Sequence, residues 1–150
     1  MNILRITKEF NFEMAHALYN HDGKCAQIHG HSYCLKVTLR GKVRNEELHS
    51  KNGMVMDFGD LKKLIKQQII DIFDHALVLN GNSPHREAIA PSAGFTNILL
   101  VPYQPSSENL LLDFVERIHE HFPPNIQLYS LKLRETNSSF AEWYAEDNEG

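Results

Sequence analysis

Two segments near the start of the chain alternate between apolar and polar residues, and this period of two constrains the fold more than any other feature. In residues 3–18 the alternation is clearest at Phe10, Phe12 and Met14, which share one parity with His16. In residues 29–43 the matching parity holds His29, His31, Tyr33, Leu35, Val37 and Leu39. Because successive strand residues point to opposite faces of a sheet, both segments are predicted to be long strands with one buried face.

A helical pattern replaces the alternation after Asp57, which is a candidate N-cap. Apolar residues then recur at spacings of three and four, at Leu61, Leu64, Ile65, Ile69, Ile72 and Phe73. A second stripe of this kind follows a serine cap in the run that begins at Pro105, and holds Leu111, Phe114, Val115, Ile118 and Phe122. These stripes predict two amphipathic helices, the second ended by Pro123 and Pro124.

Two more alternating segments follow the helices, at residues 126–135 and 141–145, and residues 53–57 and 96–103 are candidates for short extra strands. The main elements therefore follow the order ββααββ. This order predicts an α+β fold, in which an antiparallel four-stranded sheet carries both helices on one face. Such a sheet has exposed edges, and oligomerisation that joins sheets edge to edge would cover them.

The length of 150 residues fits a single domain over residues 1–150. Fifteen Lys and Arg against nineteen Asp and Glu give a net charge of −4, which argues against a nucleic-acid partner. Without an apolar run of membrane-spanning length or a signal-peptide pattern, we expect a cytoplasmic protein with no membrane contact. In that reducing compartment the two cysteines, Cys25 and Cys34, are expected to be thiols.

Three histidines fall where strands can bring them together. His29 and His31 are two residues apart and so point to the same side of a strand, and His16 ends the preceding strand on its apolar face. Three neutral imidazoles with a free fourth position are typical of catalytic zinc sites. The pattern predicts a metal site suited to zinc; the alternative is a buried His16 beside two solvated turn histidines.

Cys25 lies four residues before His29 and next to Lys24. A cation beside a thiol lowers its pKa, which suits a nucleophile or a general base. The alternative for Cys25 is a fourth ligand that closes a structural zinc site. Cys34 lies within a predicted strand, opposite the histidines, and is interpreted as a buried thiol without a chemical role.

Acidic groups mark the ends of three predicted elements. Asp74 and His75 end the first helix, where a carboxylate can orient an imidazole, although a histidine is also favoured there by the helix dipole. Glu108 lies in the first turn of the second helix, a position that favours acids in any case. Glu135 ends a strand, where its carboxylate can accept two parallel hydrogen bonds from the amidine-like edge of a pterin or guanine.

Six short motifs occur in order between residues 10 and 136. They are Phe10-x-Phe12-x-x-Ala15-His16, Cys25-x-x-x-His29-Gly30-His31, Asp57-Phe58, Phe73-Asp74-His75, Pro105-Ser106-Ser107-Glu108-Asn109 and Arg134-Glu135-Thr136. Each motif is weak alone, but the ordered set resembles the 6-pyruvoyl-tetrahydropterin synthase superfamily.

The resemblance implies a tunnelling fold, in which subunits join their sheets into a barrel and active sites form at subunit interfaces. Members are commonly homohexamers built as dimers of trimers. The implied zinc ligands are His16, His29 and His31, the implied catalytic residues are Cys25, Asp74 and His75, and the implied substrate-binding residues are Glu135, Glu108, Ser106 and Ser107.

The spacing of three residues between Cys25 and His29 resembles the spacing in the branch of the family that forms a carboxy-pterin. That likeness implies zinc-dependent conversion of 7,8-dihydroneopterin triphosphate to 6-carboxy-5,6,7,8-tetrahydropterin, acetaldehyde and triphosphate, a lyase reaction of queuosine (7-deazaguanine) biosynthesis. The alternatives are a 6-pyruvoyl-tetrahydropterin synthase, which only eliminates triphosphate, and a non-catalytic zinc- or pterin-binding protein. Residues 80–104 form a longer segment than compact bacterial members of the family have.

Overall fold

The computed structural model describes residues 2–87 and 93–149, and its longest feature is the pairing of the two alternating segments. Strands β1 (Ile3–His16) and β2 (His29–Lys42) run antiparallel, in register from Ile3 opposite Lys42 to His16 opposite His29. Both predicted strands are confirmed, although the first ends at His16 and not at residue 18. The buried side chains are those of even residues in β1 and odd residues in β2, as the alternation predicts.

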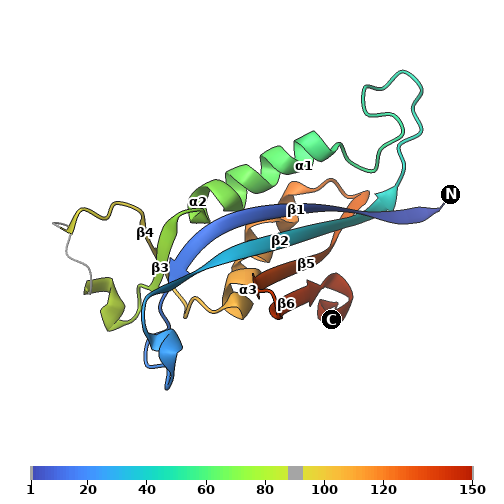
Figure 1. The fold of residues 1–150 in the computed structure, drawn as a ribbon. Helices are drawn as coiled ribbons and strands as arrows, with labels where there is room; N and C mark the ends of the chain where they lie inside the picture. The colour runs from blue at the N-terminus through green and yellow to red at the C-terminus, as the bar shows by residue number, and fades with distance from the viewer. Residues whose placement is uncertain (1, 88–92, 150) are drawn as a thin grey trace.

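The described part of the sheet holds six strands, so the prediction of four is wrong (Figure 1). Strands β5 (Ile126–Thr136) and β6 (Ser139–Tyr144) continue from β2 in antiparallel pairs. Strands β3 (Ala76–Asn80) and β4 (Ile98–Val101) extend the other side in parallel pairs. The order is β4-β3-β1-β2-β5-β6, and the sheet is mixed rather than antiparallel.

The two additional strands, β3 and β4, differ in how well the sequence predicts them. Strand β3 shows no alternation because Ala76, Val78 and Leu79 are all buried, and a short apolar run of this kind has no period that separates strand from helix. Strand β4 falls inside the candidate segment 96–103. The other candidate, residues 53–57, forms the end of a turn and a bend instead of a strand. Of the long segment at residues 80–104, residues 88–92 lie outside the described residues.

Both predicted helices are present. Helix α1 (Phe58–Ile65) is capped by Asp57, whose carboxylate accepts hydrogen bonds from the Gly59 and Asp60 amides, and it continues through a π-helical turn, η2 (Lys66–Ile70), into α2 (Asp71–Phe73). Helix α3 (Ser107–Ile118) is capped by Ser106. Short 3₁₀ turns lie in or near connections, among them η1 (Lys24–Ala26), η3 (Pro84–Glu87), η5 (His119–His121) and η6 (Ala145–Asn148). No helix among the described residues is long and apolar enough to span a membrane.

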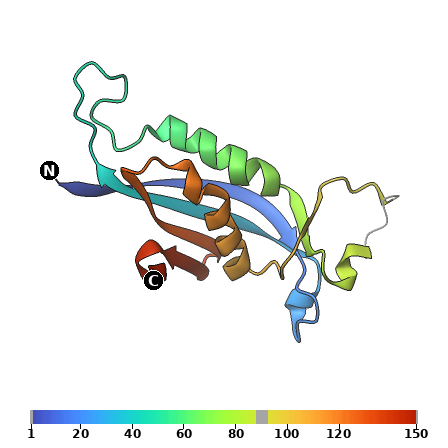
Figure 2. The ribbon, with the colours of Figure 1, turned by 180° about the vertical axis from the view of Figure 1, so that it is seen from behind.

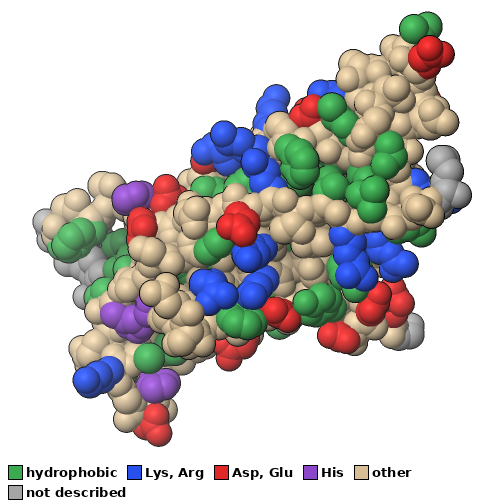
Figure 3. Space-filling model, turned by 45° about the vertical axis from the view of Figure 1, so that its right-hand side comes forward, with side chains coloured by type: hydrophobic (Ala, Val, Ile, Leu, Met, Phe, Trp, Pro, Cys, Tyr) green, Lys and Arg blue, Asp and Glu red, His purple; other side chains and the backbone are tan. Residues whose placement is uncertain are grey.

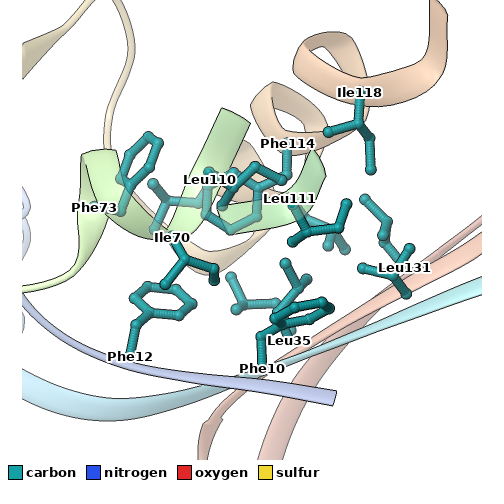
Figure 4. Close-up of a cluster of buried hydrophobic side chains, with 14 of the residues drawn as sticks. Phe10, Phe12, Leu35, Ile70, Phe73, Leu110, Leu111, Phe114, Ile118 and Leu131 are labelled. Carbon is teal, nitrogen blue, oxygen red and sulfur yellow. The ribbon is translucent and has the colours of Figure 1, made fainter. Parts of the chain in front are cut away.

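The two helices cover the same face of the curved sheet, as Figures 1 and 2 show from opposite sides. The core lies between these layers (Figure 4). Phe12 of β1 contacts Tyr33 and Phe114, with ring centroids 5.2 and 6.2 Å apart, and Phe73 packs edge-on against Phe114 at 5.0 Å. This packing fixes the ends of β1, β2 and α3 relative to one another, and the candidate site lies at those ends.

Candidate metal centre and active site

Three histidines meet where β1 ends and β2 begins. His16 lies opposite His29 in the ladder, and His31 lies opposite Met14, so all three imidazoles are on the face that carries the core. The Nε2 atoms of His16 and His29 are 3.0 Å apart, and the ring of His31 is centred 5.4 Å from that of His16 and 5.0 Å from that of His29. Histidine side chains gather at this end of the molecule, on the left in Figure 3.

Main-chain carbonyl groups bind the Nδ1 atoms of two of the rings, on the side away from the centre of the group. The Nδ1 atom of His16 lies 2.7 Å from the carbonyl oxygen of Pro105, and Nδ1 of His29 lies 2.7 Å from that of Gln27. A carbonyl oxygen only accepts, so each Nδ1 carries the hydrogen and each Nε2 presents a lone pair to the centre of the group. Burial also lowers the pKa of His16 below its ordinary value, which favours the neutral, metal-binding form.

Glu135 completes the group from the end of β5. Its Oε1 lies 2.8 Å from Nε2 of His31, and donor atoms of these two residues, His16 and His29 all lie within 4.8 Å of one another. Apart from this contact with the Glu135 carboxylate, the buried Nε2 of His31 has no hydrogen-bond partner within the described part of the chain. A cation among three imidazole nitrogens and a carboxylate oxygen would satisfy that atom, and this nitrogen and oxygen donor set suits zinc.

Cys25 is not part of this group of donors. The alternative in which the Cys25 thiolate closes a structural zinc site therefore gains no support from the group. The residue lies in the 3₁₀ turn η1, where it is partly exposed, and its carbonyl accepts a hydrogen bond from the Leu18 amide. Cys34 lies on β2 on the face opposite the histidines, as predicted, but it is only partly buried.

The start of α3 approaches Glu135 from the other side. Ser107 is buried and its hydroxyl donates a hydrogen bond to Oε2 of Glu135, while Glu108 lines the same hollow of about 300 Å³. Strand β6 closes this hollow with Ser139, Phe140 and Ala141. Three of the four predicted substrate-binding residues are therefore brought together. Ser106 differs, because its hydroxyl accepts a hydrogen bond from the Asn109 amide and caps the helix.

Asp74 and His75 follow α2 outside the group of four donors, and His75 shares a hollow with His31 of that group. His75 follows the end of α2, its side chain is 76% exposed, and it lines a hollow of about 640 Å³ that also includes Glu13, Ser32 and Asn97. Its Nε2 is 3.7 Å from Oδ1 of Asp74, which is too long for a hydrogen bond. That carboxylate instead accepts a hydrogen bond of 2.9 Å from the Glu13 amide. Cys25 does not line this hollow.

Sequence reasoning missed one residue beside the metal centre. The ring of Tyr33 packs edge-on against His16 and His31, and its hydroxyl is buried without a hydrogen bond among the described residues. Burial raises its pKa, so the phenol stays protonated. The signal was present in the sequence, because Tyr33 continues the parity of His29 and His31 along β2.

The fold and the site together define an α+β protein with a candidate metal centre of three histidines, beside which lies the carboxylate of Glu135. Residues 5–146 match the family model described as 6-pyruvoyl tetrahydropterin synthase. The chain belongs to this family, as its motifs predict.

Curated relatives align with the chain from end to end. A protein of Haemophilus influenzae named 6-carboxy-5,6,7,8-tetrahydropterin synthase is 35% identical over 144 residues, which cover 94% of this chain and 99% of the relative. A protein of the same name from Rickettsia bellii is 30% identical over 143 residues, covering 93% and 99%.

Solved structures share the fold. The 6-pyruvoyl tetrahydropterin synthase of Caenorhabditis elegans superposes with a TM-score of 0.68 at 25% identity, covering 97% of each chain. An uncharacterized protein from Wolinella succinogenes gives a TM-score of 0.80 at 20% identity, covering 97% of this chain and 99% of the other. The expected fold of the single chain is thereby confirmed, with a six-stranded sheet, and the joining of sheets between subunits stays a prediction.

Proposed function

We propose that the protein is a lyase that converts 7,8-dihydroneopterin triphosphate to 6-carboxy-5,6,7,8-tetrahydropterin, acetaldehyde and triphosphate, for queuosine (7-deazaguanine) biosynthesis. The observation that carries the proposal is the group of three histidines and Glu135, in a chain that aligns over nearly its full length with relatives named for this product.

His16, His29 and His31 would hold Zn²⁺ through their Nε2 atoms. The metal would supply a Lewis acid that lowers the pKa of the substrate's side-chain hydroxyl groups. The carbonyl groups bound to Nδ1 of His16 and His29 support this assignment, because a hydrogen bond at one ring nitrogen fixes the ring and raises the basicity of the other nitrogen.

Glu135 would recognise the pterin. A carboxylate can accept two parallel hydrogen bonds from the 2-amino group and the N3–H of this ring. In this structure its two oxygens face His31 and Ser107, so the carboxylate lies between the metal centre and the hollow that Glu108 lines. Ser107 would keep the carboxylate in place, and the pterin would enter from the side of that hollow.

Cys25 and His75 would move protons during the reaction. Cys25 would take a proton at the substrate's side-chain carbon, and His75, assisted by Asp74, would be its acid–base partner in the elimination of triphosphate and the carbon–carbon cleavage. Within one chain Cys25 lies outside the hollow of His75. Assembly into a homohexamer, with active sites between subunits, would let one chain supply Cys25 and another His75.

Mass analysis of the pterin product tests the proposal. The protein is incubated with Zn²⁺ and 7,8-dihydroneopterin triphosphate, and a chelator-treated sample is run in parallel. We expect the 6-carboxy product, formed only in the presence of metal. A 6-pyruvoyl product would assign the protein to the second candidate activity, which the description of the family model favours. Bound but unchanged pterin would support a non-catalytic binding protein.

We also propose that residues 1–150 act as one domain. The continuous sheet and the single apolar core that spans β1, β2, β5 and both helices support this. The cytoplasmic location stays a prediction from the sequence.

A further inference from the structure

The turn that carries His75 has a backbone conformation that calls for support. His75 has a φ of 63°, in the left-handed region that glycine usually occupies just after a helix. Because the left-handed conformation favours glycine over histidine, we infer that the imidazole of His75 has a role at this position. That side chain is 76% exposed, so little packing aims the imidazole, and its direction is set by the backbone.

The backbone around His75 is held from two sides. On one side, Glu13 of β1 donates its amide to Oδ1 of Asp74 and accepts the His75 amide at its carbonyl. On the other side, the side-chain amide of Asn97 donates to the carbonyl of His75 at 3.0 Å and lies 3.5 Å from that of Asp74. Asn97 therefore binds the carbonyl groups of the residue in the left-handed turn and of the one before it.

Asn97 is itself fixed by the sheet. Its carbonyl accepts a hydrogen bond of 2.9 Å from the Leu77 amide, immediately before the parallel pairing that begins with Leu77 opposite Ile98. The main-chain carbonyl of Asn97 thus binds the amide of Leu77, while its side-chain amide binds the carbonyl of His75. Phe95 and Thr96, which precede it, line the hollow that holds His75. The support on this side of the turn therefore comes from the connection between β3 and α3.

We propose that Asn97 is a positioning residue for His75. Its side-chain amide holds the left-handed turn so that the imidazole projects into the hollow at a fixed angle. This inference rests on the proposed function, in which His75 exchanges a proton with the substrate. A proton transfer depends steeply on donor–acceptor geometry, so a loosened turn slows the reaction without preventing substrate from binding.

The first arm of the test compares Asn97→Ala and Asn97→Asp with a matched control, Asn82→Ala. Asn82 lies in the same long segment and also donates its side-chain amide to a main-chain carbonyl, that of Pro102 at 3.3 Å, but it does not line the hollow of His75. We expect both Asn97 variants to lower kcat on the order of tenfold or more, with KM within about threefold of wild type. Asn97→Asp keeps the size of the side chain but replaces the NH₂ donor with a negatively charged acceptor, so a fall in kcat that both variants share cannot be a packing defect of Asn97→Ala alone. Asn82→Ala should match wild type.

The second arm does not depend on turnover. In ¹⁵N-histidine-labelled protein, the ring signals of His75, assigned by their loss in His75→Asn, should shift in both Asn97 variants and stay in place in Asn82→Ala. Unshifted His75 signals in the Asn97 variants would overturn the inference, as would shifted signals with wild-type kcat. An inactive wild-type protein would defeat the proposed function instead, and the ring signals would still report whether Asn97 sets the position of His75.

Discussion

Two histidines of the candidate metal centre are oriented by main-chain atoms outside it. Pro105 precedes α3 and Gln27 belongs to the loop between β1 and β2, yet their carbonyl groups determine which nitrogen His16 and His29 present. For His31 the neighbour is instead Glu135, whose Oε1 lies 2.8 Å from the Nε2 atom. The site therefore depends on loops and helix ends as much as on the strands that carry the ligands.

The first prediction separates the proposed zinc ligands from the proposed catalytic thiol of Cys25. In His31→Ala the affinity for Zn²⁺ should fall by more than about a hundredfold, since loss of an outer hydrogen-bond partner alone costs about ten- to a hundredfold. Cys25→Ala should keep one zinc per chain and bind pterin, but lose turnover. Metal analysis after dialysis and a product assay measure the two effects. Full zinc content in His31→Ala would refute the ligand assignment, and unchanged activity in Cys25→Ala would remove the thiol from the mechanism.

At the scale of elements, the start of helix α3 contributes both to the stability of the helix and to the candidate site. Helix α3 begins at Ser107, one residue after its cap, so two neighbouring serines have different tasks. The hydroxyl of Ser106 satisfies the Asn109 amide, and that of Ser107 binds Glu135.

Substitution of the two serines should give opposite results. Ser106→Ala should lower the free energy of unfolding by about 1 kcal/mol, the usual cost of a lost N-cap, which corresponds to about 2–4 °C in Tm. Its KM should be near that of wild type. Ser107→Ala should instead raise KM for the pterin, because Glu135 loses the hydroxyl that holds it. Thermal melts and steady-state kinetics on the pair decide this, and a raised KM in Ser106→Ala would return that residue to the substrate site.

The cap of α1 predicts a dependence of stability on pH. The Lys51 ammonium, together with the Asp60 amide, lowers the pKa of Asp57 in the folded protein below its ordinary value. The folded state therefore binds this proton less tightly than the unfolded state. The stabilisation is complete above the ordinary pKa of an aspartate and is lost as the pH falls through the lowered value.

Asp57→Asn tests this sign, because asparagine also caps helices but does not ionise. Wild type should unfold at a higher temperature than Asp57→Asn at pH 7, and the gap should narrow steadily as the pH is lowered below 4. A gap that is constant with pH would show that the charge of Asp57 contributes nothing. Asp60→Asn is the matched control, since Asp60 also faces Lys51 but accepts no cap hydrogen bond with its side chain.

Prediction from sequence succeeded where a period or a cap was present. The parity of β1 and β2 placed three histidines on one face, and Asp57 and Ser106 marked the starts of both helices. It failed for β3, whose residues are buried on both faces and so do not alternate. The contact between Glu135 and His31 joins residues far apart in the sequence, and only the register of β5 on β2 brings them together.

At the scale of the whole molecule, the sheet leaves long edges unpaired. Strand β3 covers β1 only from Met14 to His16, and β6 is the last strand on the other side. The outer edge of β1 from Ile3 to Glu13 thus has no partner strand among the described residues, and a neighbouring subunit would supply one. Assembly of this kind is also what would join Cys25 to His75.

A mixing experiment tests the shared site. Cys25→Ala and His75→Ala should each be inactive alone. If one chain supplies Cys25 and another His75, subunit exchange between the two variants should restore part of the activity. The control is an equal mixture of Cys25→Ala with the double variant Cys25→Ala/His75→Ala, which offers no intact thiol and should stay inactive. No recovery after exchange, verified by mass analysis of mixed oligomers, would place both groups in one chain.

The most direct measurement of the central claim is the ratio of acetaldehyde to triphosphate released by the zinc-loaded protein from 7,8-dihydroneopterin triphosphate. Elimination followed by carbon–carbon cleavage predicts equal amounts of both, in step with the loss of substrate. Triphosphate without acetaldehyde would contradict the account, because elimination would then stop at the pyruvoyl stage.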